Sequence, residues 1–101
     1  MEINLKELDV KHNPAENRFE TWIDGQLSKL DYLEDGDTIV MMHVGVNPDH
    51  RGQGVAGKIT EVALEYAKGK SLRVIPMCSY VRAYIDRHPD YVELTKQHTD
   101  A

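Results

Sequence analysis

The sequence predicts a single α+β domain with an α/β-type centre, in which an antiparallel meander leads into a β-α-β unit and a C-terminal helix follows. First, a chain of 101 residues has room for one hydrophobic core. Second, its 41% hydrophobic and 29% charged residues are typical of a folded domain rather than a disordered chain. Third, apolar residues alternate with polar ones in the first half and recur at helical spacing in the second.

The first half predicts antiparallel strands joined by turns. Asp24-Gly25 is the dipeptide most typical of a tight hairpin turn. Alternation along the strand before it places Phe19 on one face and Trp22 on the other. The nearly continuous apolar run over residues 38–46 predicts a central strand that is covered on both faces. The expected strands are residues 8–12, 18–23, 26–33 and 38–46.

The second half predicts two helices and one more strand. Apolar side chains share one face over residues 52–68, which predicts an amphipathic helix. Residues 72–76 predict a short buried strand, and a second helix is expected over residues 80–88 with Ser79 as its N-cap. Because one helix separates the strands at 38–46 and 72–76, they should run parallel through a right-handed crossover. Ligands of such units bind outside the carboxyl ends of the strands, near the helix N-terminus.

A glycine-rich loop, Arg51-Gly52-Gln53-Gly54-Val55-Ala56-Gly57, stands at the start of the first predicted helix. Glycine in a helix costs about 1 kcal/mol relative to alanine, so three glycines here need a reason. One interpretation is a tight strand-to-helix turn in which Gly57 allows close packing. The other is a phosphate site on the free amides of the first helical turn. The loop lacks the Gly-Lys-Ser/Thr ending of a Walker motif and the acidic partner of a dinucleotide fingerprint.

The arrangement Arg51-x-x-Gly54-x-Ala56 resembles the pyrophosphate-binding motif of the Gcn5-related N-acetyltransferases (GNAT). The resemblance extends from about residue 11 to residue 94, in particular to a short, YjdJ-type branch of that superfamily. It implies the minimal GNAT fold, with a splayed cleft between the two parallel strands. We expect one domain over residues 1–101, with a core at about 8–94 and frayed termini. The segments that carry it are Gly36-Asp37-Thr38-Ile39, His43, Arg51-Gly52-Gln53-Gly54, Pro76-x-Cys78-x-Tyr80-Val81-x-x-Tyr84-Ile85 and His88-Pro89-x-Tyr91.

The resemblance implies an acetyltransferase that uses acetyl-coenzyme A as co-substrate. The amides from Gly52 to Gly57 would hold the pyrophosphate, and the backbone of Val44 and Val46 would pair with the pantetheine arm. No pair of histidines has the helical spacing of metal ligands, so no metal is expected. The expected coenzyme A-binding residues are Val44, Val46, Arg51, Gly52, Gln53, Gly54, Val55, Ala56 and Gly57.

Two residues near the predicted ligand edge could perform chemistry. Cys78 is the only thiol; it is either a small core residue or a nucleophile, because a helix N-terminus favours a thiolate. His43 is either hydrogen-bonded in the sheet or a general base. In one scheme Cys78 accepts the acetyl group and passes it to an amine. In the other, the amine attacks directly, His43 is the base, and Cys78 or a tyrosine (Tyr84 or Tyr80) assists the leaving thiolate.

Charge and cysteine content limit the partners. The net charge of −5 argues against a nucleic-acid or membrane binder, and the single cysteine indicates a reducing, cytoplasmic setting. Residues 1–50 carry four Lys or Arg and eleven Asp or Glu (−7), whereas residues 51–101 carry eight and six (+2). This division of charge suggests an anion site in the second half and a cationic acceptor, such as a lysine-bearing peptide or a polyamine. The expected oligomeric state is a monomer or a weak homodimer. The alternatives are a non-catalytic module that binds or senses coenzyme A or acyl-coenzyme A, and an interaction domain in which the glycine loop is only a turn.

Overall fold

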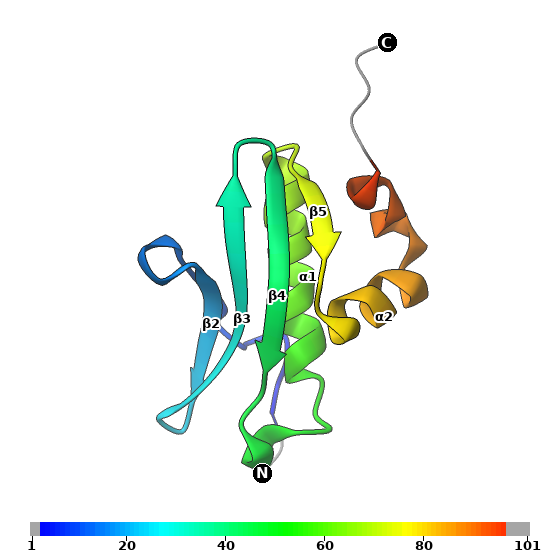
Figure 1. The fold of residues 1–101 in the computed structure, drawn as a ribbon. Coiled ribbons are helices and arrows are strands. Elements are labelled where there is room, and N and C mark those ends of the chain that lie inside the picture. Colours follow the sequence, from blue (N-terminus) through cyan, green and yellow to red (C-terminus); the bar gives the residue numbers. More distant parts are fainter. Residues whose placement is uncertain (1–2, 97–101) are drawn as a thin grey trace.

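A mixed β-sheet with two α-helices on one of its faces forms the protein (Figure 1). The computed structural model describes residues 3–96. Within them the strand order is β1-β2-β3-β4-β5, antiparallel from β1 to β4 and parallel between β4 and β5. The α+β fold with a β-α-β centre is therefore confirmed. The strands are β1 (Lys11–Asn13), β2 (Arg18–Ile23), β3 (Gln26–Asp35), β4 (Thr38–Gly45) and β5 (Arg73–Pro76). The helices are α1 (Val55–Gly69), α2 (Ser79–Arg87) and the 3-10 segments η1 (Pro14–Glu16), η2 (Pro48–His50) and η3 (Pro89–Thr95).

The turns and faces of the meander follow the sequence pattern. Asp24 and Gly25 both have positive φ, at 51° and 75°, and join β2 to β3 as a tight hairpin. Phe19 is buried and Trp22 is 58% exposed, as the alternation predicts. The first strand is shorter than expected, because β1 begins only at Lys11.

The fourth strand contains a β-bulge. Tyr32 of β3 lies opposite Met41 and Asp31 lies opposite His43, so Met42 has no partner across the ladder. Met41 is fully buried, whereas Met42 and His43 are both exposed. A bulge has this effect because the extra residue lets two successive side chains emerge on the same face.

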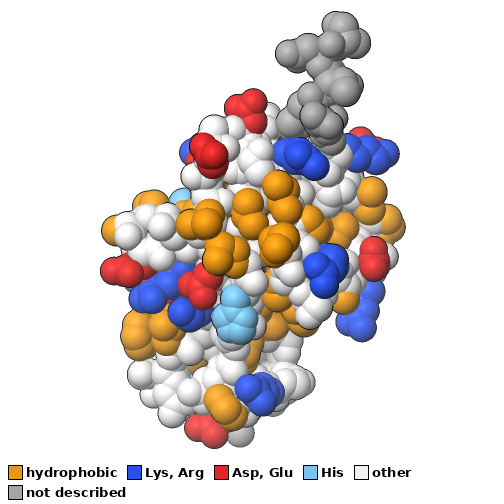
Figure 2. Space-filling model, viewed as in Figure 1, with side chains coloured by type: hydrophobic (Ala, Val, Ile, Leu, Met, Phe, Trp, Pro, Cys, Tyr) orange, Lys and Arg blue, Asp and Glu red, His pale blue; other side chains and the backbone are white. Residues whose placement is uncertain are grey.

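The prediction that residues 38–46 are covered on both faces is wrong. Both α-helices contribute to one core on a single side of the sheet, and in Figure 1 α1 runs behind it. The other face is open: Leu33 is 53% exposed opposite a half-buried Val40. Figure 2, which looks onto this open face, shows hydrophobic side chains gathered over the sheet. The apolar run therefore reflects one buried face and one exposed apolar face.

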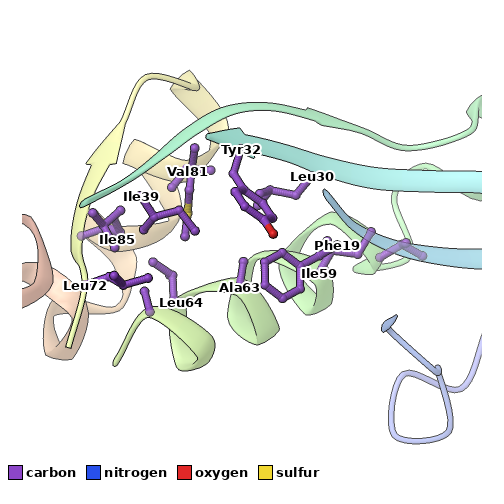
Figure 3. Close-up of a cluster of buried hydrophobic side chains, with 14 of the residues drawn as sticks. Phe19, Leu30, Tyr32, Ile39, Ile59, Ala63, Leu64, Leu72, Val81 and Ile85 are labelled. Atoms are coloured by element: carbon purple, nitrogen blue, oxygen red, sulfur yellow. The ribbon is translucent and has the colours of Figure 1, made fainter. Parts of the chain in front are cut away.

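The core lies between the sheet and the two helices (Figure 3). Side chains from the sheet pack against one face of α1 and one face of α2. The fully or nearly fully buried members include Phe19, Leu30, Tyr32, Ile39 and Met41 from the sheet, Ile59, Ala63 and Leu64 from α1, and Val81 and Ile85 from α2.

Two helix starts differ from the predictions. The first helix begins at Val55 rather than at residue 52, because Gly52 (φ 79°) and Gly54 (φ 84°) have left-handed backbone conformations that no α-helix contains. Ser79 is the first residue of α2 and not its N-cap; Cys78 is the N-cap and makes no side-chain capping hydrogen bond.

Parts of both expected frayed ends have defined positions. Ile3 packs against the core, and η3 extends to Thr95, whose carbonyl oxygen accepts a hydrogen bond from Arg73 Nε at 3.4 Å. For residues 1–2 and 97–101 the expectation of fraying lies outside the described residues.

Candidate active site

The parallel strands part at the carboxyl end of β5. Their last paired residues are Met41 and Pro76, and the Cys78 amide then donates to the Met41 carbonyl oxygen at 3.1 Å. Beyond this point the chain turns into α2, whereas β4 continues to Gly45. No strand among residues 3–96 pairs with this side of β4 after Met41. An unpaired strand edge offers backbone groups to an extended ligand.

The glycine loop continues from that open edge into α1. Gly54 is the N-cap of α1, and no side chain of residues 3–96 caps the helix there. No acidic residue lies in the first turn either. The first amides of α1, together with the positive end of the helix dipole, therefore offer a site for an anion.

Gly57 has a packing role. A Cβ atom at Gly57 would lie 3.3 Å from the Tyr80 hydroxyl oxygen and 3.6 Å from Tyr84 Cε2. The absence of a side chain therefore lets α2 approach the first turn of α1. This third glycine fits the close-packing interpretation.

Two cavities adjoin the loop. One, of about 220 Å³, is bordered by the loop together with Val46, His50 and Tyr80, and thus connects the end of β4 to the start of α1. The other, of about 330 Å³, lies between Gly57, Lys58 and Tyr84 on one side and the N-terminal residues Leu5 and Lys6 on the other. Together they flank the first turn of α1.

His50 is a member of the site that the sequence analysis missed. Its side chain is only 5% exposed, Nε2 lies 3.9 Å from an Asp24 carboxylate oxygen, and Nδ1 has no hydrogen-bond partner within residues 3–96. A buried polar atom without a partner costs about 1–3 kcal/mol, so a water or ligand group that reached this nitrogen would offset that cost. Its place next to Arg51 in the motif was the only sequence signal.

The structure brings His43 and Cys78 to the same end of the sheet without joining them. His43 is exposed on the open face, where its Nε2 would lie 3.2 Å from a Cβ added to Gly45. Cys78 is half-buried and packs against the core. No hydrogen bond between these two side chains occurs in the described part of the chain.

The two candidate tyrosines lie one helical turn apart on α2. Tyr80 borders the cavity that contains Val46, and burial raises the pKa of its phenol. Tyr84 lies farther along, with its ring stacked on His88 at a centroid distance of 4.0 Å. Burial, and then the nearby Glu61 carboxylate, raise the pKa of Tyr84. Both phenols thus stay protonated at neutral pH, and Tyr80 is the one beside the end of β4.

The remaining predicted binding residues contribute in different ways. Val55 is buried in the core, so only its backbone faces the loop, and the Arg51 side chain is exposed. The Gln53 side chain is already engaged, because its Oε1 accepts a hydrogen bond from the Ile3 amide at 3.2 Å. Val44 and Val46 are half-buried and pack against the core.

Residues 3–96 contain neither a cluster of metal-ligating side chains nor a membrane-spanning helix. No three His, Cys, Asp or Glu side chains among residues 3–96 gather closely enough to hold a metal ion. None of the helices in this part of the chain is sufficiently long and apolar to cross a membrane.

Comparisons with known proteins identify the family and the fold of the chain. The family model for the GCN5-related N-acetyltransferases matches residues 18–94, from β2 through η3. The solution NMR structure of a GCN5-like protein from Staphylococcus aureus superimposes with a TM-score of 0.70. The two sequences are 26% identical, and the match covers 92% of each chain. The short branch within the superfamily is not distinguished by these matches and stays a prediction.

Proposed function

The chain belongs to the GCN5-related N-acetyltransferases, and from that premise we propose that it binds acetyl-coenzyme A and transfers the acetyl group to an amine. The observation that carries the proposal is the continuity of the site. The open edge of β4 beyond Met41 leads directly into the cavity lined by the glycine loop and His50. An extended pantetheine arm and a pyrophosphate need these two features side by side.

In the proposed complex, the backbone of Val44 and Val46 pairs with the pantetheine arm as an added strand would. The amides from Gly52 to Gly57 bind the pyrophosphate at the positive end of α1. His50 supports this assignment, since it borders the same cavity and its Nδ1 has no hydrogen-bond partner among residues 3–96. The exposed Arg51 side chain adds a nearby positive charge.

For the chemical step we propose direct attack by the amine. The amine nitrogen forms a bond to the thioester carbonyl carbon, the carbon–sulfur bond breaks, and the leaving thiolate takes up a proton. His43 accepts the proton that the amine loses, because it is exposed on the open face where an acceptor can approach. The Tyr80 hydroxyl lies at the pyrophosphate end of the site, 3.3 Å from the Cβ position of Gly57, so in this scheme the thiolate takes its proton from water.

An acetylated Cys78 is the second candidate mechanism. Its position at the N-terminus of α2 favours that route, since a helix N-terminus stabilises a thiolate. Its half-burial against the core, and the absence of a hydrogen bond to a base within residues 3–96, favour direct attack.

The surroundings of His43 bear on the acceptor. Asp31, the residue opposite His43, is paired with Lys29 at 3.2 Å, and the open face nearby carries the exposed Met42 and Leu33. This mixture favours an amine attached to an apolar group. The excess of acidic residues in the first half supports a lysine-bearing peptide or a polyamine as the other acceptor to test. The single thiol suggests a reducing, cytoplasmic setting for the reaction.

The decisive experiment combines coenzyme A titration calorimetry with acetyl transfer to a panel containing an arylalkylamine, a lysine peptide and a polyamine. We expect the Cys78→Ala variant to retain most activity. We expect His43→Gln to bind coenzyme A normally but to lose about 10²–10⁴-fold in kcat, the range for removing a general base. The reverse pattern would favour the covalent mechanism, and a gain of one acetyl group in the intact mass of the wild type but not of Cys78→Ser would distinguish it from proton donation by Cys78. Coenzyme A binding without transfer to any amine would indicate a binding or sensing module, and no binding at all would overturn the proposal.

A further inference from the structure

An N-terminal strap, residues 3–7, lies across the glycine loop. The Ile3 amide donates to Gln53 Oε1 at 3.2 Å, a contact that links residues 50 positions apart. The strap has its own folded shape: the Glu7 amide donates to the Asn4 carbonyl oxygen at 3.1 Å, and the Lys6 amide donates to Asn4 Oδ1 at 3.1 Å. The strap is therefore an ordered turn placed on the loop.

The closest contact lies at the N-cap of α1. A Cβ atom built on Gly54 would be only 2.7 Å from Leu5 Cδ1. Leu5 thus fills the space that the missing side chain of Gly54 leaves open. By contrast, a Cβ on Gly52 would meet nothing within 4 Å, so the strap covers one particular part of the loop.

The strap also borders the cavity on the far side of this N-cap. Leu5 and Lys6 line it together with Gly54, Gly57, Lys58 and Glu61. Gly54 also lines the cavity that contains His50, so Leu5 lies against the residue that the two cavities share. A diphosphate that accepts hydrogen bonds from these amides must come within about 3 Å of their nitrogens.

The strap is held weakly enough to leave. Ile3 and Leu5 are half-buried, and Asn4, Lys6 and Glu7 are exposed. Among the described residues, the Ile3–Gln53 contact is its one hydrogen bond to the loop. A displacement of residues 3–7 would therefore leave the sheet and both helices intact.

We propose that this strap is a built-in competitor of coenzyme A, which must swing away from Gly54 before the pyrophosphate can bind. The inference rests on the proposed function, because it regulates the same site. When a binding site is free in only a fraction of molecules, the apparent dissociation constant rises by the inverse of that fraction. A strap closed in about nine molecules of ten would weaken coenzyme A binding about tenfold.

Calorimetric titration of coenzyme A into the wild type, Leu5→Ala and Asn4→Ala tests the proposal. Leu5→Ala removes the atoms over Gly54, and Asn4→Ala loosens the turn from an exposed position that the core does not need. We expect tighter binding in both, by about three- to tenfold. Glu16→Ala is the control, at an exposed position of η1 beside β1, the strand at the opposite edge of the sheet from β5, and should bind as the wild type does.

Hydrogen exchange supplies a readout that does not depend on activity. Coenzyme A should accelerate exchange of the Lys6 and Glu7 amides in the wild type, because the displaced strap loses the hydrogen bonds of its turn. Weaker binding of Leu5→Ala would overturn the proposal and indicate that the strap closes over bound coenzyme A. Equal affinity in all variants with unchanged exchange would overturn it as well, while leaving the proposed function intact. Failure of every variant to bind coenzyme A would instead refute the proposed function.

Discussion

Replacing Gly54 with alanine should destabilise the protein more than the same change at Gly52. Both glycines have a positive φ, 84° and 79°, and each substitution places an L-residue in the left-handed region. That conformation costs about 1 kcal/mol relative to glycine. The backbone strain is therefore the same at the two positions, and Gly52→Ala is the matched control.

The difference between the two variants comes from Leu5. The new Cβ at position 54 would lie 2.7 Å from Leu5 Cδ1, well inside the optimal carbon–carbon separation of about 3.5–4.0 Å. Leu5 must then leave its half-buried position, and full burial of a leucine contributes about 1.5–3 kcal/mol. Losing about half of that gives a further cost of about 1 kcal/mol. We therefore expect about 1 kcal/mol of destabilisation for Gly52→Ala and about 2 kcal/mol for Gly54→Ala.

Urea denaturation followed by far-ultraviolet circular dichroism measures both values. A double-mutant cycle with Leu5→Ala isolates the contact, because a shortened side chain no longer meets the new methyl group. The cycle should return a coupling free energy of about 1 kcal/mol. Equal destabilisation of the two glycine variants, with no coupling to Leu5→Ala, would show that Leu5 does not lie over Gly54 in solution.

Three other predictions concern the sheet and core. The 2.7 Å hydrogen bond from the Tyr66 hydroxyl, and next the charge of Lys70, hold the pKa of Glu34 below its usual value. The ionised Glu34 therefore stabilises the fold at pH values above its unfolded pKa, and this contribution is lost as the pH falls through its folded pKa. Tyr66→Phe should therefore lower the free energy of unfolding by about 0.5–1 kcal/mol at pH 7 and by less at pH 2, where the hydrogen bond from Lys70 to the same hydroxyl remains, as urea denaturation at the two pH values can show. Ile59→Ala should lower the free energy of unfolding by about 2–5 kcal/mol because Ile59 is fully buried, whereas Leu33→Ala, at a position 53% exposed on the open face, should lower it much less. The raised pKa of Tyr91, caused by burial and then by its 2.6 Å hydrogen bond to Glu65, predicts that Tyr91→Phe removes a tyrosine ionisation that occurs above the usual tyrosine range in an absorbance titration.

Local patterns predicted most of the fold because they act over a few residues. The positive φ values at Asp24 and Gly25 are what that dipeptide supplies, and alternation placed Phe19 inside and Trp22 outside. Helical spacing located α1 between two parallel strands, and the topology followed from the crossover rule.

Features that depend on distant contacts could not be predicted in this way. An apolar run looks the same whether its second face is covered by a helix or left open, so the prediction that β4 is covered on both faces was wrong. The bulge at Met42 depends on the register of β3 against β4, which the sequence of either strand leaves undetermined. Leu5 lies against Gly54, and His50 lies beside Asp24, both far away in the sequence. Neither Leu5 nor His50 belongs to a sequence pattern that predicts such a contact.

The structure explains the three glycines of the loop without any ligand. Gly52 and Gly54 have positive φ values, which alone explain their lack of a side chain, and Gly57 is explained by the approach of Tyr80. A glycine count therefore gives no independent support for a ligand, since each of the three has a structural reason. The support comes instead from the open edge of β4, which has no strand partner beyond Met41 within residues 3–96, and from the cavity that follows it. Substitution of the exposed Arg51 at that cavity thus tests coenzyme A binding more cleanly than any glycine substitution, whose effect on stability would accompany its effect on affinity.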